Sequence, residues 1–583
     1  MKMEPIAMHG GDRVGAALAA HGVRFVFTLC GGHISPILTA SKVRGIRIVD
    51  VRDEATAVFA ADAVARLTGV PGVAAVTAGP GLTNTITALK NAQLAQSPVI
   101  LLGGAAPTAL QGRGALQDID QRPLVAPHVK LFRKIRQVRD LGPAVEEAFA
   151  VARAGVPGPV FIECPVDLLY DEASIRGWYA EAAGKGTAIP DRLLRFYLNR
   201  HVEKMFAGSS EAAAPQVRDV SPPSASAASV AAAAAALARA ERPLMVIGSQ
   251  ALSIAAEAPR IAAAVAKLGI PVYLSGMARG LLGRDHALQM RHQRRQALRE
   301  SDCVVLAGVP CDFRLDYGRH VRRGATLIAA NRSVRDARMN RRPDIAAIGD
   351  AGLLLERLVA PLGRTGRRWT SWIEDLRTRD LKREAEIEEQ ARPQAGFVNP
   401  IAFLRALEQA AGENAVIIAD GGDFVATASY ILHPRSPLSW LDPGVFGTLG
   451  VGAGFALGAA LCRPGSEIWI IYGDGACGYS LIEFDTFVRH GIPVIAVVGN
   501  DAGWTQIARE QVKMLHDDVG TVLARSAYHE VAAGFGAEGI LVTNIADAPA
   551  ALERARAAAK AGKPVLLNVW LDKTEFRDGS ISM

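Results

Sequence analysis

The chain has 583 residues, of which 50% are hydrophobic and 21% are charged. This length and composition exclude a disordered or fibrous protein and suit three or four domains with large buried cores. The net charge of +7 comes from lysines and arginines that are spread along the chain, without a basic stripe that contains aromatic residues. That distribution argues against nucleic-acid binding and favours an enzyme that handles anionic substrates.

The cysteines and the amino terminus give no sign of an exported or membrane protein. Six cysteines are scattered, without a CxxC pair or a histidine at the spacing of a metal ligand, so neither a disulfide framework nor a zinc site is expected. No stretch has the length and purity of a membrane span, and the amino-terminal segment lacks the apolar core of a signal peptide. We therefore expect a cytoplasmic protein that does not bind a membrane.

The first part of the chain, residues 1–180, alternates short apolar runs with helical segments. Each run has the length of a strand and is followed by a turn or a helix, which is the pattern of a parallel α/β domain. The runs are VRFVFTL, IRIVDV, GVAAVTA, PVILLGG and GPVFIEC. Residues 181–235 are predicted to be a linker, because a stretch rich in Ser, Pro and Ala precedes a helix of small residues.

Two further regions repeat this alternation. Residues 236–365 contain PLMVIGS, IPVYLSG, DCVVLAG and ATLIAAN, and residues 399–583 contain AVIIADGGDF, EIWIIYGDG, PVIAVVGND and PVLLNVW. A charged helical segment, residues 366–398, separates these two regions and is predicted to be a second linker. The fold class that we predict is α/β, with three doubly wound parallel-sheet domains in series.

The third region contains two oxygen-rich turns that are separated by a predicted helix and a predicted strand. Asp474 lies in a Gly-Asp-Gly turn after the run EIWIIY, and Asn500 and Asp501 follow the run PVIAVV. The carboxyl ends of neighbouring parallel strands meet at one edge of a sheet, so these side chains should lie close together. Oxygen ligands suit Mg²⁺, and the glycines around Asp474 let a phosphate group approach the backbone. The sequence thus predicts a site for Mg²⁺ and a diphosphate.

A Gly-Asp-Gly turn alone is also a common helix cap, so longer motifs decide between the two interpretations. Motifs over nearly the whole chain resemble the thiamine-diphosphate enzymes, in the branch of the acetolactate synthases and 2-hydroxyacyl-CoA lyases. In chain order they are HGVRF, GGHISP, VTAGPGLTNT, FGTLGVGAGFALGA, GYSLIEFDTFVRH, GNDAGWTQ and FRDGSIS. The resemblance implies that the three regions are a pyrimidine-binding (PYR) domain, a middle domain and a diphosphate-binding (PP) domain.

The resemblance also implies the ligands of the metal ion. Asp474 is one ligand, and the backbone carbonyl group of Gly503 is the expected third. The second ligand is open, because this chain has Asn500 and Asp501 where the family usually has two asparagines. The spacing from Asp474 favours Asp501, whereas a shift of one residue would favour Asn500.

In the PYR domain the resemblance implies roles for five residues. Glu54, at the start of an amphipathic helix, corresponds to the glutamate that hydrogen-bonds N1′ of the aminopyrimidine ring and shares a proton with it. Without the family context, Glu54 would be a first-turn carboxylate stabilised by the helix dipole. Pro80 and Asn84 shape the pyrimidine pocket. Gln117 faces the reacting carbon, and His33 lies in the substrate-side loop, where a purely structural histidine is an equal alternative.

In the PP domain a glycine-rich motif corresponds to the part of the family that holds the bent cofactor. By resemblance, Leu449 is the apolar wedge beneath the cofactor, although a helix packed closely on a sheet would show the same glycine pattern. A second turn, at the end of a neighbouring strand, could meet the diphosphate through backbone N–H groups. The cofactor-binding residues expected in this domain are Gly421, Gly422, Asp423, Gly447, Thr448, Leu449, Gly473, Gly475 and Ala476.

The middle domain has scattered cations near the ends of its predicted strands. They could bind the phosphates of CoA or of ADP, or they could be solvated, and the sequence does not decide among these. They are Arg279, Arg284, Arg291, Arg294, Arg295 and Arg332.

The reaction that the resemblance implies is thiamine-diphosphate-dependent cleavage of a 2-hydroxyacyl-CoA to formyl-CoA and an aldehyde or ketone, together with the reverse condensation. One alternative is an acetolactate synthase, which joins two 2-keto acids and carries FAD in the middle domain. Another is a homologue without a cofactor, and the presence of Glu54 and Asp474 argues against it.

The expected assembly is a homodimer or homotetramer with active sites at the subunit interface. Glu54 and Asp474 lie in different domains, and in the family the two domains that hold one cofactor come from different subunits. The tail, residues 572–583, is charged and contains glycine, so we expect it to act as a lid over the site.

Overall fold

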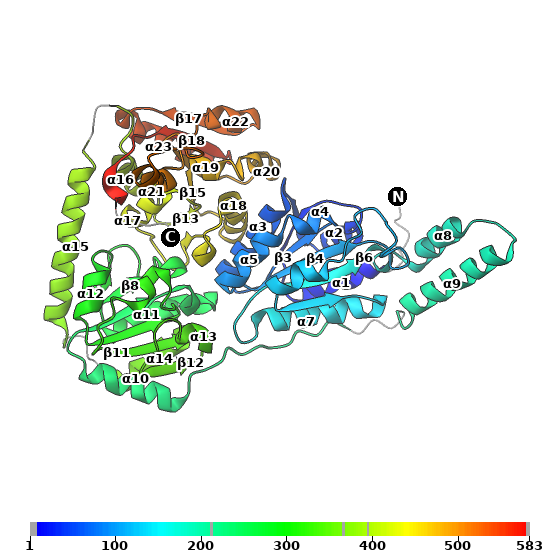
Figure 1. Cartoon of the computed structure of the whole chain (residues 1–583), viewed down its shortest axis with the longest axis horizontal. Coiled ribbons are helices and arrows are strands. Elements are labelled where there is room, and N and C mark those ends of the chain that lie inside the picture. Colours follow the sequence, from blue (N-terminus) through cyan, green and yellow to red (C-terminus); the bar gives the residue numbers. More distant parts are fainter. Residues whose placement is uncertain (1–8, 210–213, 364–367, 393–395, 579–583) are drawn as a thin grey trace. The chain divides into compact units, whose positions relative to one another are not determined.

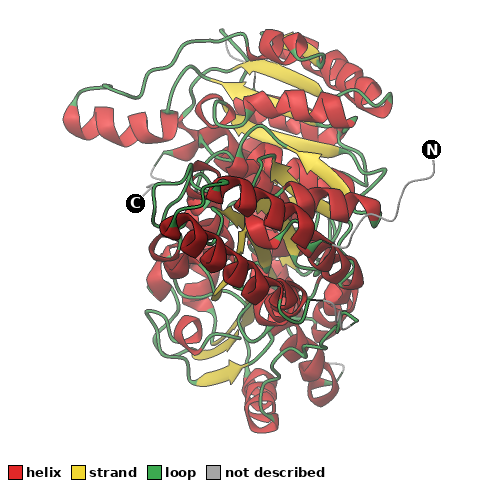
Figure 2. Ribbon diagram, turned by 90° about the vertical axis from the view of Figure 1, so that its right-hand side faces the viewer, coloured by secondary structure: helices red, strands yellow, loops and turns green. Residues whose placement is uncertain are grey.

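The structure is a computed structural model that describes residues 9–209, 214–363, 368–392 and 396–578. It confirms the predicted fold class, because these residues form three six-stranded sheets in which neighbouring strands are parallel. Helices lie on both faces of the sheets (Figures 1 and 2). The chain divides into two compact units, one of Met1–Arg66 with Val70–Ser221 and the other of Leu67–Gly69 with Pro222–Met583.

The first unit is built on a sheet with the strand order β2-β1-β3-β4-β6-β5. Its strands are β1 (Phe25–Leu29), β2 (Arg47–Asp50), β3 (Gly72–Val76), β4 (Val99–Ala105), β5 (Leu131–Lys134) and β6 (Val160–Pro165). Its first helices are α1 (Gly10–Ala20), α2 (Ser35–Val43), α3 (Glu54–Thr68), α4 (Pro80–Thr83), α5 (Ile86–Ala95), α6 (Arg122–Val125) and α7 (Leu141–Arg153). All residues of β4 are buried, because both faces of a parallel sheet are covered, and this explains its continuous apolar run.

Two more helices, α8 (Glu172–Ala183) and α9 (Ile189–Phe206), follow β6 and lie side by side (Figure 1). Helix α9 falls inside the predicted linker 181–235, so part of that segment is helical and belongs to the first unit. The end of α9 joins the core of the unit through Val202, Met205 and Phe206.

The second unit begins with the middle sheet, whose strand order is β12-β11-β10-β7-β8-β9. Counted within the sheet and from its other edge, this is the order 3-2-1-4-5-6 of doubly wound Rossmann-type domains. Its strands are β7 (Pro243–Ile247), β8 (Val272–Leu274), β9 (Gln289–Met290), β10 (Cys303–Ala307), β11 (Thr326–Asn331) and β12 (Ile345–Ile348). Its helices are α10 (Ala227–Arg239), α11 (Ala258–Leu268), α12 (Arg294–Glu300), α13 (Val334–Ala337) and α14 (Ala351–Leu362).

The third sheet has the strand order β14-β13-β15-β16-β18-β17. Counted within each sheet, the first and third sheets therefore share the order 2-1-3-4-6-5. The strands are β13 (Val416–Ala419), β14 (Trp440–Leu441), β15 (Ile468–Gly473), β16 (Ile495–Asn500), β17 (Glu538–Val542) and β18 (Val565–Trp570). The helices are α16 (Pro400–Ala410), α17 (Asp423–Ile431), α18 (Val451–Cys462), α19 (Asp474–Cys477), α20 (Phe484–His490), α21 (Thr505–Leu515), α22 (Tyr528–Gly534) and α23 (Ala548–Lys560).

The charged helix predicted between the second and third regions is α15 (Thr370–Gln390). It runs alongside both domains of the second unit (Figure 1). Trp372 and Leu376 pack into the core of the middle domain, and Ile387 packs into the core of the third. Helix α15 thus ties the two domains together. Across the parts of the chain that the structure describes, no helix combines the length and apolar character needed to span a membrane.

Candidate active site

The first group of predicted site residues lies at the carboxyl edge of the first sheet, where the chain leaves β1 and β3 toward opposite sides. Ligands of doubly wound domains bind at such a point. The hydroxyl of Thr77, which follows β3, lies 3.1 Å from Nδ1 of His33 and donates to Oε1 of Gln117 at 3.5 Å. Burial lowers the pKa of His33, which favours the neutral imidazole at pH 7. Thr77 therefore brings His33 and Gln117 together, and sequence analysis did not single it out.

Glu54 is the second feature of this edge. It begins α3 and is only 5% exposed. Nδ2 of Asn84 donates to Oε2 of Glu54 at 3.0 Å, so the structure brings these two predicted residues together. A Cβ atom on Gly81 would lie 3.5 Å from the other carboxylate oxygen. Pro80 begins the short helix α4 that presents Asn84 at its end, and Pro80 itself is exposed.

The second group lies at the carboxyl edge of the third sheet, where β13, β15 and β16 end. Asp474 is 2% exposed and accepts hydrogen bonds from the backbone N–H groups of Gly475 at 2.8 Å and Gly503 at 3.1 Å. Burial, and then the carboxylate of Asp501, raise the pKa of Asp474 to about 6. Burial also raises the pKa of Asp501. A buried carboxylate and a half-buried carboxylate that opposes its ionisation suit a divalent cation between them.

Asn500 and Asp501, which the sequence left as alternatives, have different surroundings. Asn500 is fully buried, and its amide nitrogen donates to Asn568 Oδ1 at 3.2 Å and to the carbonyl oxygen of Ser526 at 3.3 Å. Its amide oxygen accepts from the N–H group of Ala502 at 3.3 Å. Asp501 instead lines the cleft that contains Asp474. Asp501 could therefore hold an ion in the cleft, whereas the side chain of Asn500 is engaged in hydrogen bonds within the domain.

A cleft of about 350 Å³, which includes space open to solvent, lies over these strand ends. It is lined by Gly422, Asp423, Phe424, Gly473, Asp474, Gly475, Ala476, Gly499, Asp501, Gly503, Trp504, Thr505, Gln506 and Ile507. A Cβ atom on Gly475 would lie 2.5 Å from the ring of Trp504, and one on Gly473 would lie 2.9 Å from the carbonyl oxygen of Gly421. Only glycine fits at these two positions. The N–H group of Gly473 donates to the carbonyl oxygen of Gly421 at 3.0 Å and that of Gly475 donates to Asp474, so these glycines serve the cleft by leaving room for a phosphate to approach.

Leu449, the predicted wedge, lies directly over Gly421. A Cβ atom on Gly421 would be 2.2 Å from Cδ2 of Leu449. The turn that carries Leu449 also contains Gly447, at φ +65°, and Thr448, whose hydroxyl donates to the carbonyl oxygen of Leu449 at 3.2 Å. The structure thus brings the glycine-rich motif to the turn after β13.

Asp420 fixes this arrangement, and sequence analysis passed over it. Its carboxylate accepts from the N–H groups of Gly450 at 2.9 Å and Gly452 at 2.6 Å, which begin α18 directly after Leu449. Asp420 is 3% exposed, and burial raises its pKa to about 7 although the two N–H donors act in the opposite direction. The sequence feature that could have identified Asp420 is an acidic residue between an apolar strand and two glycines.

Asp423 has a cationic partner that was also missed. Arg509 of α21 lies 2.8 Å from its carboxylate, and both side chains are largely buried. The same guanidinium group lies 3.3 Å from Asp578 of the tail. Phe576 of the tail packs edge-on against Tyr430 of α17. The predicted lid role of the tail stays a prediction, and residues 579–583 lie outside the described residues.

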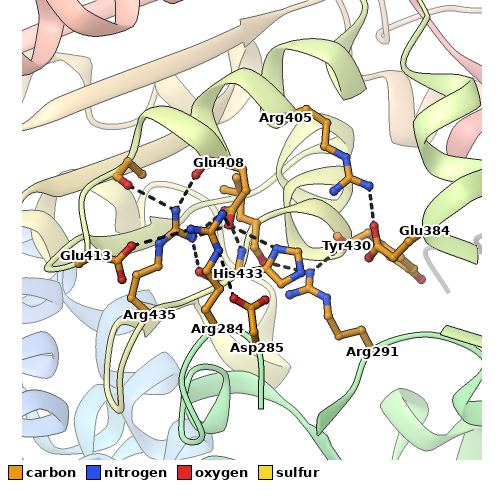
Figure 3. Close-up of polar contacts among 12 residues, drawn as sticks. Arg284, Asp285, Arg291, Glu384, Arg405, Glu408, Glu413, Tyr430, His433 and Arg435 are labelled. Atoms are coloured by element: carbon orange, nitrogen blue, oxygen red, sulfur yellow. Dashed lines mark hydrogen bonds and ion pairs between the residues drawn. The ribbon is translucent and has the colours of Figure 1, made fainter. Parts of the chain in front are cut away.

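The predicted cations of the middle domain make contacts within the second unit. Arg332 forms a buried ion pair with Asp350 at 2.7 Å, and Arg284 lies 3.2 Å from Glu408 of α16 (Figure 3). Arg279 and Arg291 donate to backbone carbonyl groups of α17. Arg294 donates to the carbonyl oxygen of Arg314, and Arg295 is exposed.

Comparison with known proteins agrees with this geometry. Three family models match successive parts of the chain: the N-terminal TPP binding domain of thiamine pyrophosphate enzymes at residues 8–124, their central domain at 230–358 and their C-terminal TPP binding domain at 420–569. The chain belongs to the thiamine pyrophosphate enzymes. The two edges described above lie in the N-terminal and C-terminal domains of this family.

Relatives of this thiamine pyrophosphate enzyme include proteins with two different names. The chain is 52% identical to 2-hydroxyacyl-CoA lyase 2 of Bos taurus and 51% identical to that of Homo sapiens, over 99% of this chain and 92% of each relative. It is 35% identical to the acetolactate synthase large subunit IlvG of Mycobacterium tuberculosis, over 97% of this chain and 96% of that protein.

Proposed function

We propose that the protein is a thiamine-diphosphate-dependent carbon–carbon lyase that cleaves 2-hydroxyacyl-CoA to formyl-CoA and an aldehyde or ketone, and that it also catalyses the reverse condensation. The observation that carries this proposal is the 51–52% identity, over nearly the whole chain, to proteins named 2-hydroxyacyl-CoA lyase 2. The acetolactate synthase alternative is supported only by relatives at 35% identity.

In this proposal the PP domain holds the diphosphate and Mg²⁺. Asp474, Asp501 and the carbonyl group of Gly503 are the protein ligands of the ion. Mg²⁺ takes an octahedral shell, so these three protein ligands leave positions for phosphate oxygens and water. The glycines at 421, 422, 473 and 475, together with Ala476, present the backbone to the diphosphate.

The PYR domain supplies the proton and the substrate contacts. Bound thiamine diphosphate supplies the carbanion that allows the bond between C1 and C2 of the substrate to break. Glu54, held by Asn84, keeps a proton at N1′ of the pyrimidine ring, and Pro80 forms part of the pocket wall. His33, linked to Gln117 through Thr77, is a neutral imidazole that can donate to or accept from the reacting oxygen.

We further propose that the middle domain binds the ADP part of CoA, since its strand order reverses between β7 and β10 and ligands of doubly wound domains bind at such a point. FAD would occupy it only in the acetolactate synthase alternative.

The six cysteines are free thiols, which supports a reducing, cytoplasmic compartment.

Product analysis tests the reaction. Purified protein with thiamine diphosphate and Mg²⁺ would be offered a panel of 2-hydroxyacyl-CoAs and of 2-keto acids, with mass spectrometry of the products. Formyl-CoA and an aldehyde from the first set support the lyase. Acetolactate from pyruvate, with flavin absorbance in the protein, would instead support the synthase. A lack of thermal stabilisation by thiamine diphosphate with Mg²⁺ would point to a homologue without a cofactor.

Mixing two inactive variants tests the proposed assembly, in which each site combines Glu54 of one subunit with Asp474 of another in a homodimer or homotetramer. Glu54→Gln and Asp474→Asn are each expected to be inactive. If the sites are shared between subunits, each hybrid dimer has one intact site, and random mixing recovers roughly a quarter of the wild-type activity. Sites built within one chain would give no recovery.

A further inference from the structure

Helix α17 connects the candidate cofactor cleft with the middle domain. Its N-terminal residues, Asp423 and Phe424, line the cleft together with the preceding Gly422. The helix has nine residues, which corresponds to a length of about 13 Å. Its C-terminal end, at Ile431, therefore lies outside the cleft. Because a helix is rigid, contacts that hold this end also hold Gly422 and Asp423 at the other end, which faces the cleft.

Two arginines of the middle domain hold this far end. Nη1 of Arg279 donates to the carbonyl oxygen of Ser429 at 2.8 Å. Nη2 of Arg291 donates to the carbonyl oxygens of Tyr430 at 2.7 Å and Leu432 at 3.0 Å. Figure 3 shows the Arg291 guanidinium directed at this end of the helix. The last carbonyl groups of a helix carry a partial negative charge and lack partners within it, so cations are favoured there.

Both arginines are themselves fixed in place. The guanidinium of Arg279 lies over the ring of Trp440, 5.2 Å from its centroid. The backbone N–H group of Arg291 donates to Oδ2 of Asp380 in α15 at 2.9 Å. Burial lowers the pKa of Arg279. Burial together with Arg279 lowers the pKa of Arg291 to about 10, so Arg291 remains charged at neutral pH.

Neighbouring contacts make the support of Arg291 rigid. Asp380 also accepts from the N–H group of His292 at 2.8 Å, and Nε2 of His292 lies 2.7 Å from Glu384. Arg405 of α16 donates to the same Glu384 at 2.5 Å (Figure 3). The middle domain, α15 and the PP domain are thus joined around the C-terminal end of α17.

We propose that Arg279 and Arg291 are positioning residues for the cofactor: they hold α17 so that Gly422 and Asp423 meet the diphosphate. The middle domain thereby sets the affinity for thiamine diphosphate without lining its cleft. This inference rests on the proposed function, since it presumes that the cleft binds the diphosphate.

The test measures cofactor affinity in full-length Arg279→Gln and Arg291→Gln. Thiamine diphosphate is titrated at saturating Mg²⁺ with tryptophan fluorescence as the readout, and hydrogen exchange of residues 423–431 is followed in parallel. Each variant loses hydrogen bonds made by a charged donor, so the Kd is expected to rise about tenfold. Turnover at saturating cofactor should stay within about twofold, and exchange in α17 should accelerate. Arg291→Lys keeps the charge and is expected to recover part of the affinity.

Two control variants separate positioning from general stability. Arg332→Gln breaks the buried pair with Asp350 in the same domain, and Arg295→Gln removes an exposed cation. Both should bind thiamine diphosphate like the wild type. The inference is overturned if Arg279→Gln and Arg291→Gln also bind like the wild type, or if Arg332→Gln weakens binding equally. A wild-type protein that does not bind thiamine diphosphate would overturn the proposed function, and this inference with it.

Discussion

Asp420→Asn is the substitution whose effect can be worked out most fully from the structure. The carboxylate is buried, accepts two backbone N–H groups and has a pKa of about 7 instead of 3.8. The folded protein therefore binds a proton more tightly at Asp420 than the unfolded chain does. The stability associated with this proton is fully present below pH 3.8 and is lost as the pH rises to about 7, a change of about 4 kcal/mol.

Asparagine at position 420 cannot ionise, so this part of the pH dependence should disappear. Its amide oxygen can accept only one of the two N–H groups well, and the unpaired one costs about 1–3 kcal/mol. The variant should thus be less stable than the wild type at pH 5 or equal to it, and more stable at pH 8, where the wild type buries a charge.

The assay is the thermal unfolding midpoint of the cofactor-free protein, followed by circular dichroism between pH 5 and 8. The measured quantity is the difference in midpoint between Asp420→Asn and the wild type at each pH. Asp518→Asn, at an exposed aspartate of the same domain, is the control and should show a constant difference. A constant difference for Asp420→Asn as well would refute the reasoning about the buried carboxylate.

Three further outcomes are expected. Gly421→Ala places a Cβ atom 2.2 Å from Leu449, so turnover at saturating cofactor should fall about tenfold in a steady-state assay, whereas Gly534→Ala, with open space around its Cβ, should not change it. Because burial and Asp501 raise the pKa of Asp474 to about 6, protons compete with Mg²⁺, and calorimetry should show about tenfold weaker Mg²⁺ binding at pH 5 than at pH 7. Deleting residues 575–583 removes the contacts of Phe576 with Tyr430 and of Asp578 with Arg509, and should lower turnover; unchanged turnover would argue against a lid.

The sheets and the closeness of Asp474 to Asp501 could be predicted because both follow from local rules. Apolar runs of strand length that alternate with helices leave a parallel sheet as the stable arrangement, and a βαβ unit returns the chain to the same edge. Glu54 and Asn84 needed the resemblance to a family, since an acidic residue in the first turn of a helix is common.

The remaining residues could not be predicted because their roles depend on contacts between distant segments. Asp420 acts on the N–H groups of Gly450 and Gly452, and Arg279 reaches a carbonyl group 150 residues away. Backbone groups are the same in every residue, so a partner of this kind leaves no mark in the sequence. The role of Thr77 could not be predicted either, because any hydroxyl side chain at a strand end could link His33 to Gln117.

The shared strand order of the first and third sheets extends to the residues that follow their first strands. Cys30-Gly31-Gly32-His33 comes after β1, and Asp420-Gly421-Gly422-Asp423 comes after β13. An ancestral domain that was duplicated and then diverged would leave this trace in the sequence. The turns themselves differ, because Gly422 has a φ of +112° and α17 begins at Asp423, whereas α2 begins two residues after His33. The same pair of glycines would then follow the first strand of both sheets, with an imidazole after it in one domain and a carboxylate after it in the other.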